Sequence, residues 1–169
     1  LEKAAVMPIA PVKPSDWSEL DHADAAFSSR RDSFFSSRPA YNGSEYRWGD
    51  RRAEILAFIV VADGAVFPPT IKPGSLVNVY GPYRFSEVIV RPILVFTLKT
   101  KEGVTIYGTN TEMGDVIGHV PDGAAGASLV AKFEAKTLCG AGDYFLSVGV
   151  ASRDVNGEVI PHDRRYDSI

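Results

Sequence analysis

Cysteine and long apolar runs are almost missing from this sequence. The one cysteine, Cys139, has no second thiol with which to form an internal disulfide or a paired metal site. The longest apolar stretch, residues 55–62, is of strand length and far short of the ~20 residues that a transmembrane helix needs. Residues 1–4 lack the charged-then-apolar layout of a signal peptide. We therefore expect a piece of a longer protein that works in a reducing compartment, with no membrane span of its own.

Histidine is scarce as well, which limits the possible metal sites. His22, His119 and His162 do not have metal-ligand spacing, and neither Cys139 nor a carboxylate completes a zinc pattern with them. No Gly-x-Ser-x-Gly elbow is present. Residues 103–110 have the glycine spacing of a phosphate-binding loop but lack its lysine. The sequence therefore predicts no metal site, no cofactor and no catalytic residues.

Two catalytic arrangements stay open at this point. Cys139 with a distant histidine would make a nucleophile pair, although a small residue filling a strand end is the simpler interpretation. Two carboxylates brought together by the fold would suit glycoside hydrolysis. The acidic residues available for that role, each more typical of a solvated strand face or a turn, are Glu87, Glu134, Asp143 and Asp154.

Composition and charge indicate an ordinary globular domain and argue against nucleic-acid binding. Of the 169 residues, 45% are apolar and 23% are charged, which is enough to build one hydrophobic core. The formal net charge is −3, whereas a nucleic-acid module needs a basic face to replace phosphate counterions. We expect no nucleic-acid partner.

The composition changes near residue 45 and divides the chain into two parts. Residues 1–44 contain four prolines and a serine-rich stretch, which is typical of a linker arm. Asp16 and Glu19 have the spacing of a capping box, so a short helix is expected within this arm. Residues 45–169 alternate short β-type runs with turns and are expected to form the folded domain.

Seven short runs in the second part predict strands. They lie at 53–62, 76–80, 88–100, 104–109, 129–135, 144–151 and 158–160. Several runs alternate between apolar and polar residues, which is typical of antiparallel strands with one buried face, and no crossover helix separates them. The expected fold class is all-β: an antiparallel two-sheet β-sandwich, immunoglobulin-like or jelly-roll-like, with an N-terminal linker arm. Leu138, Gly142 and Tyr144 also resemble a tyrosine corner, in which the phenol locks an edge loop.

The remaining surface chemistry suits a sugar ligand. Sugars present apolar C–H faces to aromatic rings, and hydroxyl groups to Asn, Arg, Lys and carboxylates. Such residues gather on and just after the run 76–80, and two more are expected to point outward from later strands. The candidate ligand-binding residues are Asn78, Tyr80, Tyr83, Arg84, Tyr107 and Lys132. Exposed strands ordinarily contain outward Tyr, Thr and Lys, so a plain solvated surface stays open as well.

An ordered set of motifs resembles a known protein family. The motifs are Trp48-Gly49-Asp50, the run 76–80 after Pro73-Gly74, the stretch 103–111, Gly142-Asp143-Tyr144 and, in the tail, His162-Asp163 with Tyr166-Asp167. In this order, from Tyr46 to Tyr166, they resemble the C-terminal domain of Wzt-type proteins. These proteins are the ATP-binding subunits of ABC transporters that export O-antigen polysaccharide.

The resemblance implies a function and a set of partners. The domain would recognise the non-reducing end of an O-polysaccharide glycan without catalysis. It would be joined through the arm to an ATP-binding domain of the same polypeptide, and would work with the transporter's membrane subunit. It would be a homodimer at the cytoplasmic face of the bacterial inner membrane. Two alternatives remain: a protein-interaction or structural β-sandwich, and, with less support, a glycan-modifying enzyme.

Overall fold

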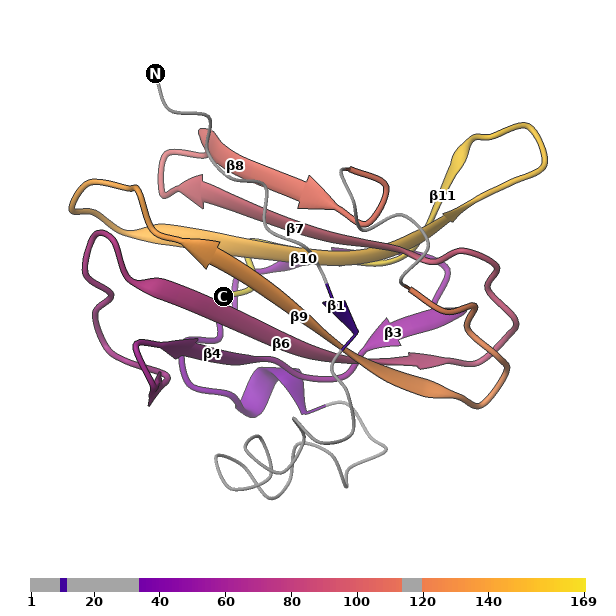
Figure 1. The fold of residues 1–169 in the computed structure, drawn as a ribbon. Helices are drawn as coiled ribbons and strands as arrows, with labels where there is room; N and C mark the ends of the chain where they lie inside the picture. The colour runs from indigo at the N-terminus through magenta and orange to yellow at the C-terminus, as the bar shows by residue number, and fades with distance from the viewer. Residues whose placement is uncertain (1–9, 12–33, 114–119) are drawn as a thin grey trace.

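The chain folds into two stacked antiparallel sheets, seen edge-on in Figure 1. The structure is a computed structural model, and it describes residues 10–11, 34–113 and 120–169. The short helix expected near Asp16, together with His22 and His119, lies outside the described residues. The all-β two-sheet sandwich predicted from the alternation is confirmed.

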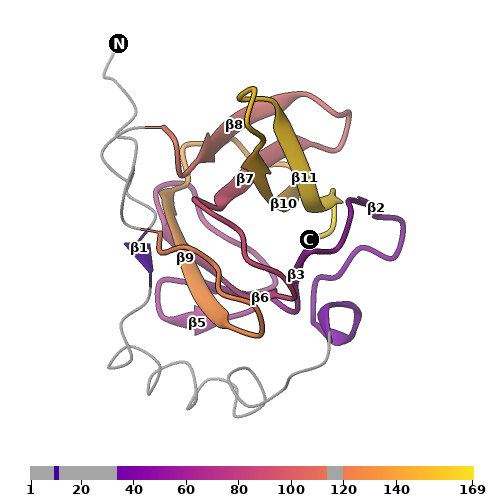
Figure 2. The ribbon, with the colours of Figure 1, turned by 90° about the vertical axis from the view of Figure 1, so that its right-hand side faces the viewer.

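The first sheet, called sheet A, has the strand order β1-β9-β6-β4-β5, and β3 also pairs with β6. Its strands are β1 (Ala10–Pro11), β3 (Ala53–Ile55), β4 (Ile59–Ala62), β5 (Ala65–Val66), β6 (Leu76–Phe85) and β9 (Ser128–Lys136). The second, called sheet B, has the order β2-β11-β10-β7-β8. Its strands are β2 (Tyr46–Trp48), β7 (Ile93–Thr100), β8 (Thr105–Asn110), β10 (Tyr144–Arg153) and β11 (Val159–Tyr166). Figure 2 shows the two layers from the end.

Aromatic side chains from both sheets fill the space between the layers. Phe96 of β7 and Phe133 of β9 stack across the core with ring centroids 5.2 Å apart. Phe58 lies 4.6 Å from Phe35, which belongs to a single 3-10 turn, η2 (Phe35–Ser37). Burial of such a ring contributes about 2–3 kcal/mol of hydrophobic stabilisation. Phe35 is fully buried, so this part of the expected linker arm packs into the domain.

The expected run at 53–62 is two strands, and the reason lies in the neighbouring strand. Strand β6 continues past Tyr80 through Gly81-Pro82 to Phe85. Pro82 has no N–H to donate, and its carbonyl accepts from Leu56, in the gap between β3 and β4. A proline in a central strand is therefore accommodated where the partner strand is interrupted.

Two further boundaries differ from the sequence prediction. Strand β7 begins at Ile93, after Pro92, because a proline is tolerated at a strand start but not within the ladder. Strand β11 reaches Tyr166, whereas the expected run ended at residue 160. The sequence pattern does not predict this part of the strand, because the inward side chains between Asp163 and Arg165 are ionic rather than apolar.

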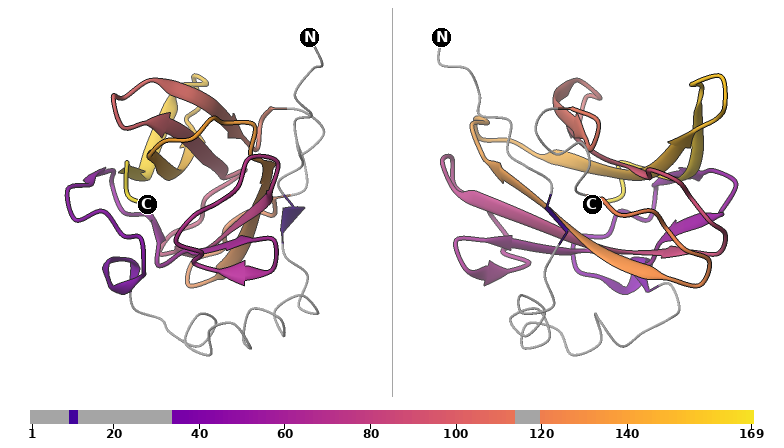
Figure 3. Two further views of the ribbon diagram at one scale, coloured as in Figure 1. Left: turned by 90° about the vertical axis from the view of Figure 1, so that its left-hand side faces the viewer. Right: turned by 45° about the vertical axis from the view of Figure 1, so that its right-hand side comes forward.

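The predicted tyrosine corner is confirmed. The Tyr144 hydroxyl donates to the carbonyl oxygen of Gly140 over 2.7 Å, closing the loop between β9 and β10. Asn156-Gly157 also forms a turn: Gly157 has a φ of 82° and lies between β10 and β11. This β10–β11 hairpin projects away from sheet A (Figure 3).

Candidate functional site

The outer side of sheet B carries a group of aromatic rings at its β2 edge. Tyr46 and Tyr166 are cross-strand partners whose rings stack at 6.4 Å with an interplanar angle of 19°. Trp48 lies one outward position along β2 and is paired with Arg164. Tyr46 is 68% exposed and Trp48 38% exposed. A single exposed ring is ordinary on a strand, but several rings gathered on one surface often mark a place where a ligand or a partner binds. We call Tyr46, Trp48, Arg164 and Tyr166 the aromatic face.

A glycine of strand β10 adjoins the aromatic face. The register places one line of partners across all five strands of sheet B: Trp48, Arg164, Gly149, Val95 and Asn110. A Cβ added at Gly149 would lie only 2.7 Å from Cδ of Arg164, so the arginine stem runs over this glycine. A larger residue here would push Arg164 away from the sheet.

Two cations flank the ring of Tyr166. The Lys99 ammonium lies 5.1 Å from the ring centroid, and the Arg164 guanidinium carbon lies 5.3 Å from it. Arg164 also donates from Nη2 to the Tyr166 hydroxyl over 3.2 Å. Lys99 forms an ion pair with Asp167 at 3.3 Å. The face therefore combines flat rings with positively charged donors, which is the chemistry expected of a surface for polar ring-shaped ligands.

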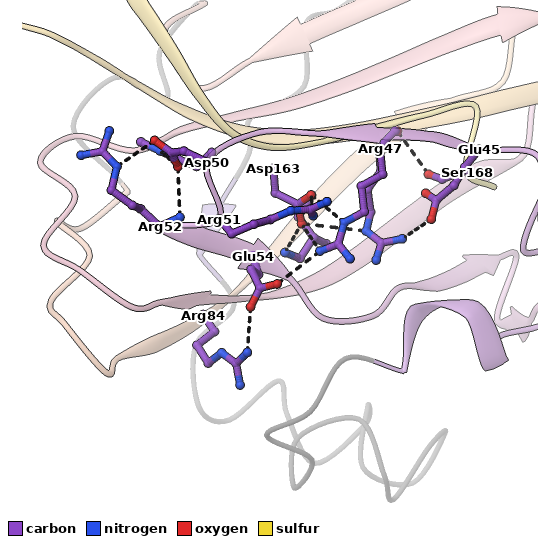
Figure 4. A network of polar contacts seen from close by, with 12 residues as sticks. Glu45, Arg47, Asp50, Arg51, Arg52, Glu54, Arg84, Asp163 and Ser168 are labelled. Carbon is purple, nitrogen blue, oxygen red and sulfur yellow. Dashed lines mark hydrogen bonds and ion pairs between the residues drawn. The ribbon is translucent and has the colours of Figure 1, made fainter.

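The inward side of the same strands carries a network of polar contacts, shown in Figure 4. Arg47 lies between Tyr46 and Trp48 and points into the sandwich. Its guanidinium binds both carboxylate oxygens of Asp163, each over 2.8 Å. Asp163 has no solvent exposure. Because β2 is a three-residue edge strand, this pair is its main side-chain anchor.

Asp163 also accepts hydrogen bonds from strand β3 and from the loop that precedes it. Arg51 donates to Oδ1 over 2.6 Å, and the backbone N–H of Ile55 donates to Oδ2 over 2.9 Å. Burial alone would lower the pKa of Arg47, but its hydrogen bonds and its attraction to Asp163 raise that pKa overall. Arg47 therefore stays charged. The carboxylate of Asp163 thus joins sheets A and B at this end.

A buried serine and histidine lie in series with an exposed aspartate beside this anchor. The two ring nitrogens of His162 lie 2.8 Å from Oδ1 of Asp50 and 2.8 Å from Oγ of Ser152. The order matches that of a hydrolase triad. However, His162 has no exposure and Ser152 only 8%, so the hydroxyl is not presented to a substrate. The arrangement instead ties the loop after β2 to the β10–β11 hairpin.

The structure brings four of the sequence-predicted residues together on the outer side of sheet A. Asn78 and Tyr80 of β6 are outward and pair with Glu134 and Lys132 of β9. The Lys132 ammonium lies 6.0 Å from the Tyr80 ring centroid and 2.9 Å from a carboxylate oxygen of Glu134.

Arg84 lies on the same side of sheet A, nearer the end of β6, and is bound to Glu54 over 2.8 Å. Ile59 and Val130 on this side are buried, with exposures of 0% and 4%, so a large part of it is covered.

Two predicted site residues point elsewhere, and both corrections follow from strand geometry. Tyr83 is 1% exposed and belongs to the core, because it has the same parity along β6 as Val77 and Val79. Burial raises the pKa of its phenol, with a smaller contribution from Asp163. Tyr107 was expected to project outward, but its ring packs edge-on against Phe96 at 6.3 Å, on the inner side of sheet B.

Sequence reasoning missed the aromatic face because its parts are far apart in the chain. Tyr46 and Tyr166 pair only once β2 and β11 are known to be neighbours. The available signal was the spacing of Tyr46 and Trp48 around one arginine, which is the alternation of a short strand with an aromatic outer side.

Among the residues that the structure describes, no group of three or more His, Cys, Asp and Glu is placed to hold a metal ion. No helix in the same part of the chain is long and apolar enough to cross a membrane.

Two stacked antiparallel sheets with an exposed aromatic edge define a β-sandwich domain. The family described as Wzt C-terminal domain matches residues 44–169, and the chain belongs to that family. The fold is similar to the crystal structure of the C-terminal domain of Wzt, with a TM-score of 0.78 and 28% sequence identity. That similarity covers 83% of this chain and 84% of the other. No curated protein matches the sequence. The resemblance read from the motifs is confirmed.

Proposed function

We propose that this domain binds the O-antigen polysaccharide carried by an ABC transporter, without changing it chemically, and that the aromatic face is its binding surface. Membership of the Wzt C-terminal domain family supports the transporter context. The observation that carries the proposal is the stacked pair of Tyr46 and Tyr166 beside the exposed Trp48. Sugar rings place their C–H faces on such surfaces, and their hydroxyl groups bind nearby donors.

The aromatic face suits recognition better than chemistry. Its one charged residue is Arg164, and the ion pair of Lys99 with Asp167 lies beside it; these described residues offer one carboxylate, whereas glycoside hydrolysis uses two. In the Ser152, His162 and Asp50 series, the serine and the histidine are buried. We therefore favour a recognition step that selects cargo over a glycan-modifying enzyme.

The outer side of sheet A is a second candidate surface. Tyr80 and Lys132 lie side by side there, with Asn78 and Arg84 on either side along β6. An aromatic ring with adjacent polar groups also suits a sugar. We rank it below the aromatic face because its apolar residues Ile59 and Val130 are buried.

The wider context is part of the same proposal. The linker-like composition of residues 1–44 suits a connection to an ATP-binding domain of the same polypeptide. We further propose a homodimer that works with the transporter's membrane subunit at the cytoplasmic face of the bacterial inner membrane. Two weak sites in one assembly would bind a repeating glycan with added avidity.

Calorimetric titration tests the proposal. The chain is titrated with purified O-polysaccharide of the source strain and, as the matched control, with an O-polysaccharide of different repeat structure. Saturable heat with the first and none with the second, with the polysaccharide intact afterwards, supports recognition. Cleavage or trimming of the glycan would point to the enzyme alternative. No heat with either would contradict glycan binding and favour a protein-interaction sandwich.

A further inference from the structure

We infer that His162 is a positioning residue for ligand binding, which acts by fixing the place and orientation of Trp48 on the aromatic face. The inference rests on the proposed function and adds to it a residue that has no solvent exposure of its own. It follows from a bulge in β11, from the contacts of the loop that begins after Trp48, and from the two partners of the His162 ring.

Strand β11 contains a β-bulge at His162. Val150 of β10 pairs with Asp163, and Ala151 pairs with Pro161, so the register passes over His162 as an extra residue. His162 and Asp163 are both fully buried, whereas consecutive residues of a regular strand point to opposite sides of the sheet. Because the extra residue of a bulge is left out of the ladder, its backbone groups can bind elsewhere.

The backbone of the bulge holds the loop after β2, the strand that ends at Trp48. The carbonyl oxygen of His162 accepts from the N–H of Arg51 over 2.9 Å. The carbonyl oxygen of the preceding residue of β11 accepts from the N–H of Asp50 over 3.3 Å. Gly49 lies against the His162 carbonyl so closely that a Cβ there would overlap it. The three residues that follow Trp48 are therefore all held by the bulge.

The ring of His162 fixes the same loop from inside. Its Nδ1 lies 2.8 Å from Oδ1 of Asp50, and because an ionised carboxylate only accepts, Nδ1 carries a proton and donates it. Its Nε2 lies 2.8 Å from the hydroxyl of Ser152 in β10. The ring is fully buried and bonded at both nitrogens, so it is held in one orientation. Asp50 passes that orientation on to the loop.

Trp48 is the member of the aromatic face that depends on this support. It is the last residue of a three-residue edge strand, and β11 is its one neighbouring strand in sheet B. Tyr46, at the other end of β2, is stacked on Tyr166. A ring that is already ordered in the free protein loses less entropy when a sugar stacks on it. The bulge therefore contributes to affinity by holding Trp48 in place before the ligand arrives.

The test separates a loss of position from a loss of stability. Wild type, H162A and V60A are titrated calorimetrically with the O-polysaccharide of the source strain, and each is also made in a W48A background. Val60 is buried in β4 of sheet A, which does not adjoin β2, so V60A lowers stability through lost core volume. Urea denaturation gives the stability of each variant, and the titrations are run well below every thermal midpoint.

A spectroscopic measurement follows Trp48 without a ligand. The chain has two tryptophans, so the substitution W17F leaves Trp48 as the one that fluoresces. Acrylamide quenching of this fluorescence is measured for W17F alone and for W17F combined with H162A, V60A or S152A. It reports how accessible the ring of Trp48 is in the free protein.

We expect H162A to lose about fivefold or more in affinity and to make Trp48 more accessible to acrylamide. V60A should match wild type in affinity and in quenching, although it is less stable. In the W48A background, H162A should cost less than about twofold, because the residue through which it acts is gone. S152A keeps the contact between His162 and Asp50, so its effect on quenching should be smaller than that of H162A.

Three outcomes would overturn the inference while glycan recognition stands. Wild-type affinity and quenching in H162A would show that the bulge does not position the ring. An equal loss of affinity with and without Trp48 would show that His162 acts elsewhere. A similar loss in V60A would show that lower stability alone weakens binding. If wild type does not bind the glycan at all, the proposed function fails, and the quenching still decides whether His162 positions Trp48.

Discussion

Arg47 and Asp163 are joined by two parallel hydrogen bonds of 2.8 Å, although 116 residues separate them in the chain. This pair anchors β2, which carries two of the rings of the aromatic face, to β11, which carries the third. The ionic interior of the sandwich and its aromatic exterior are therefore two sides of the same strands. Substitution of either residue should lower the free energy of unfolding. It should also weaken ligand binding, because the position of β2 depends on the pair.

Replacement of Arg47 by Met should destabilise the fold by about 3 kcal/mol, because it removes one partner of a buried charge pair. Asp163 would keep Arg51 and the N–H of Ile55, which limits the loss. The free energy of unfolding is measured by urea denaturation. The matched control is K101M, which breaks the exposed pair with Asp143 and should leave stability unchanged. Equal effects of the two variants would show that the buried pair is not an anchor.

Gly49 is the position where the backbone permits no side chain. Its φ is 136°, and a Cβ there would lie 2.2 Å from the carbonyl oxygen of His162. Because the obstacle is backbone, G49A should cost at least about 2 kcal/mol of unfolding free energy. G43A is the control, since nothing lies within 4 Å of a Cβ at that position. A stable G49A protein with an unchanged thermal midpoint would refute this view of the loop.

The tyrosine corner makes a small, measurable contribution. Y144F removes the hydrogen bond to Gly140 and should lower the free energy of unfolding by about 1 kcal/mol. Y107F tests the specificity of that loss, since Tyr107 contacts the core through its ring. Both variants are compared by urea denaturation. If the loss in Y107F equalled that in Y144F, the hydroxyl of Tyr144 would not be what stabilises the corner.

Acid should weaken the loop after β2 through Asp50. Burial alone would raise the pKa of Asp50, but hydrogen bonds from the Arg52 N–H, His162 and the Arg52 side chain lower it overall. A carboxyl with a lowered pKa in the folded state stabilises the fold above its unfolded pKa, and this stability is lost as the pH falls.

The thermal midpoint should therefore drop as the pH falls below about 4, the unfolded pKa of an aspartate. The drop should be smaller in D50N, which has no charge to lose. An identical pH dependence of the two proteins would contradict the assignment.

The sequence predicted the fold class and missed details that depend on pairing. Alternation in 76–80 correctly oriented Asn78 and Tyr80, and the same parity extended to residue 85 would have placed Tyr83 in the core. The expected run stopped at Tyr80, whereas β6 continues through Gly81-Pro82, a pair that is more typical of turns. Only the gap between β3 and β4 shows why a proline is tolerated there.

The aromatic face was beyond sequence reasoning for a different reason. Its members come from strands near opposite ends of the domain's sequence. Their contact depends on the order β2-β11-β10 in sheet B. The ionic residues around Asp163 conceal β11 from any search for alternating apolar residues. The motifs at Trp48-Gly49-Asp50 and His162-Asp163 were recognised as a family pattern, and the structure supplies their physical reason: they bind each other.

The central claim is that glycan binding resides on the aromatic face of sheet B. The most direct test is calorimetric titration of Y46A/W48A with the O-polysaccharide of the source strain, beside the sheet A variant Y80A/K132A and wild type. We predict at least about a tenfold loss of affinity in Y46A/W48A and wild-type affinity in Y80A/K132A. Wild-type affinity in Y46A/W48A, with binding lost only in the sheet A variant, would contradict the account and move the site to the other face.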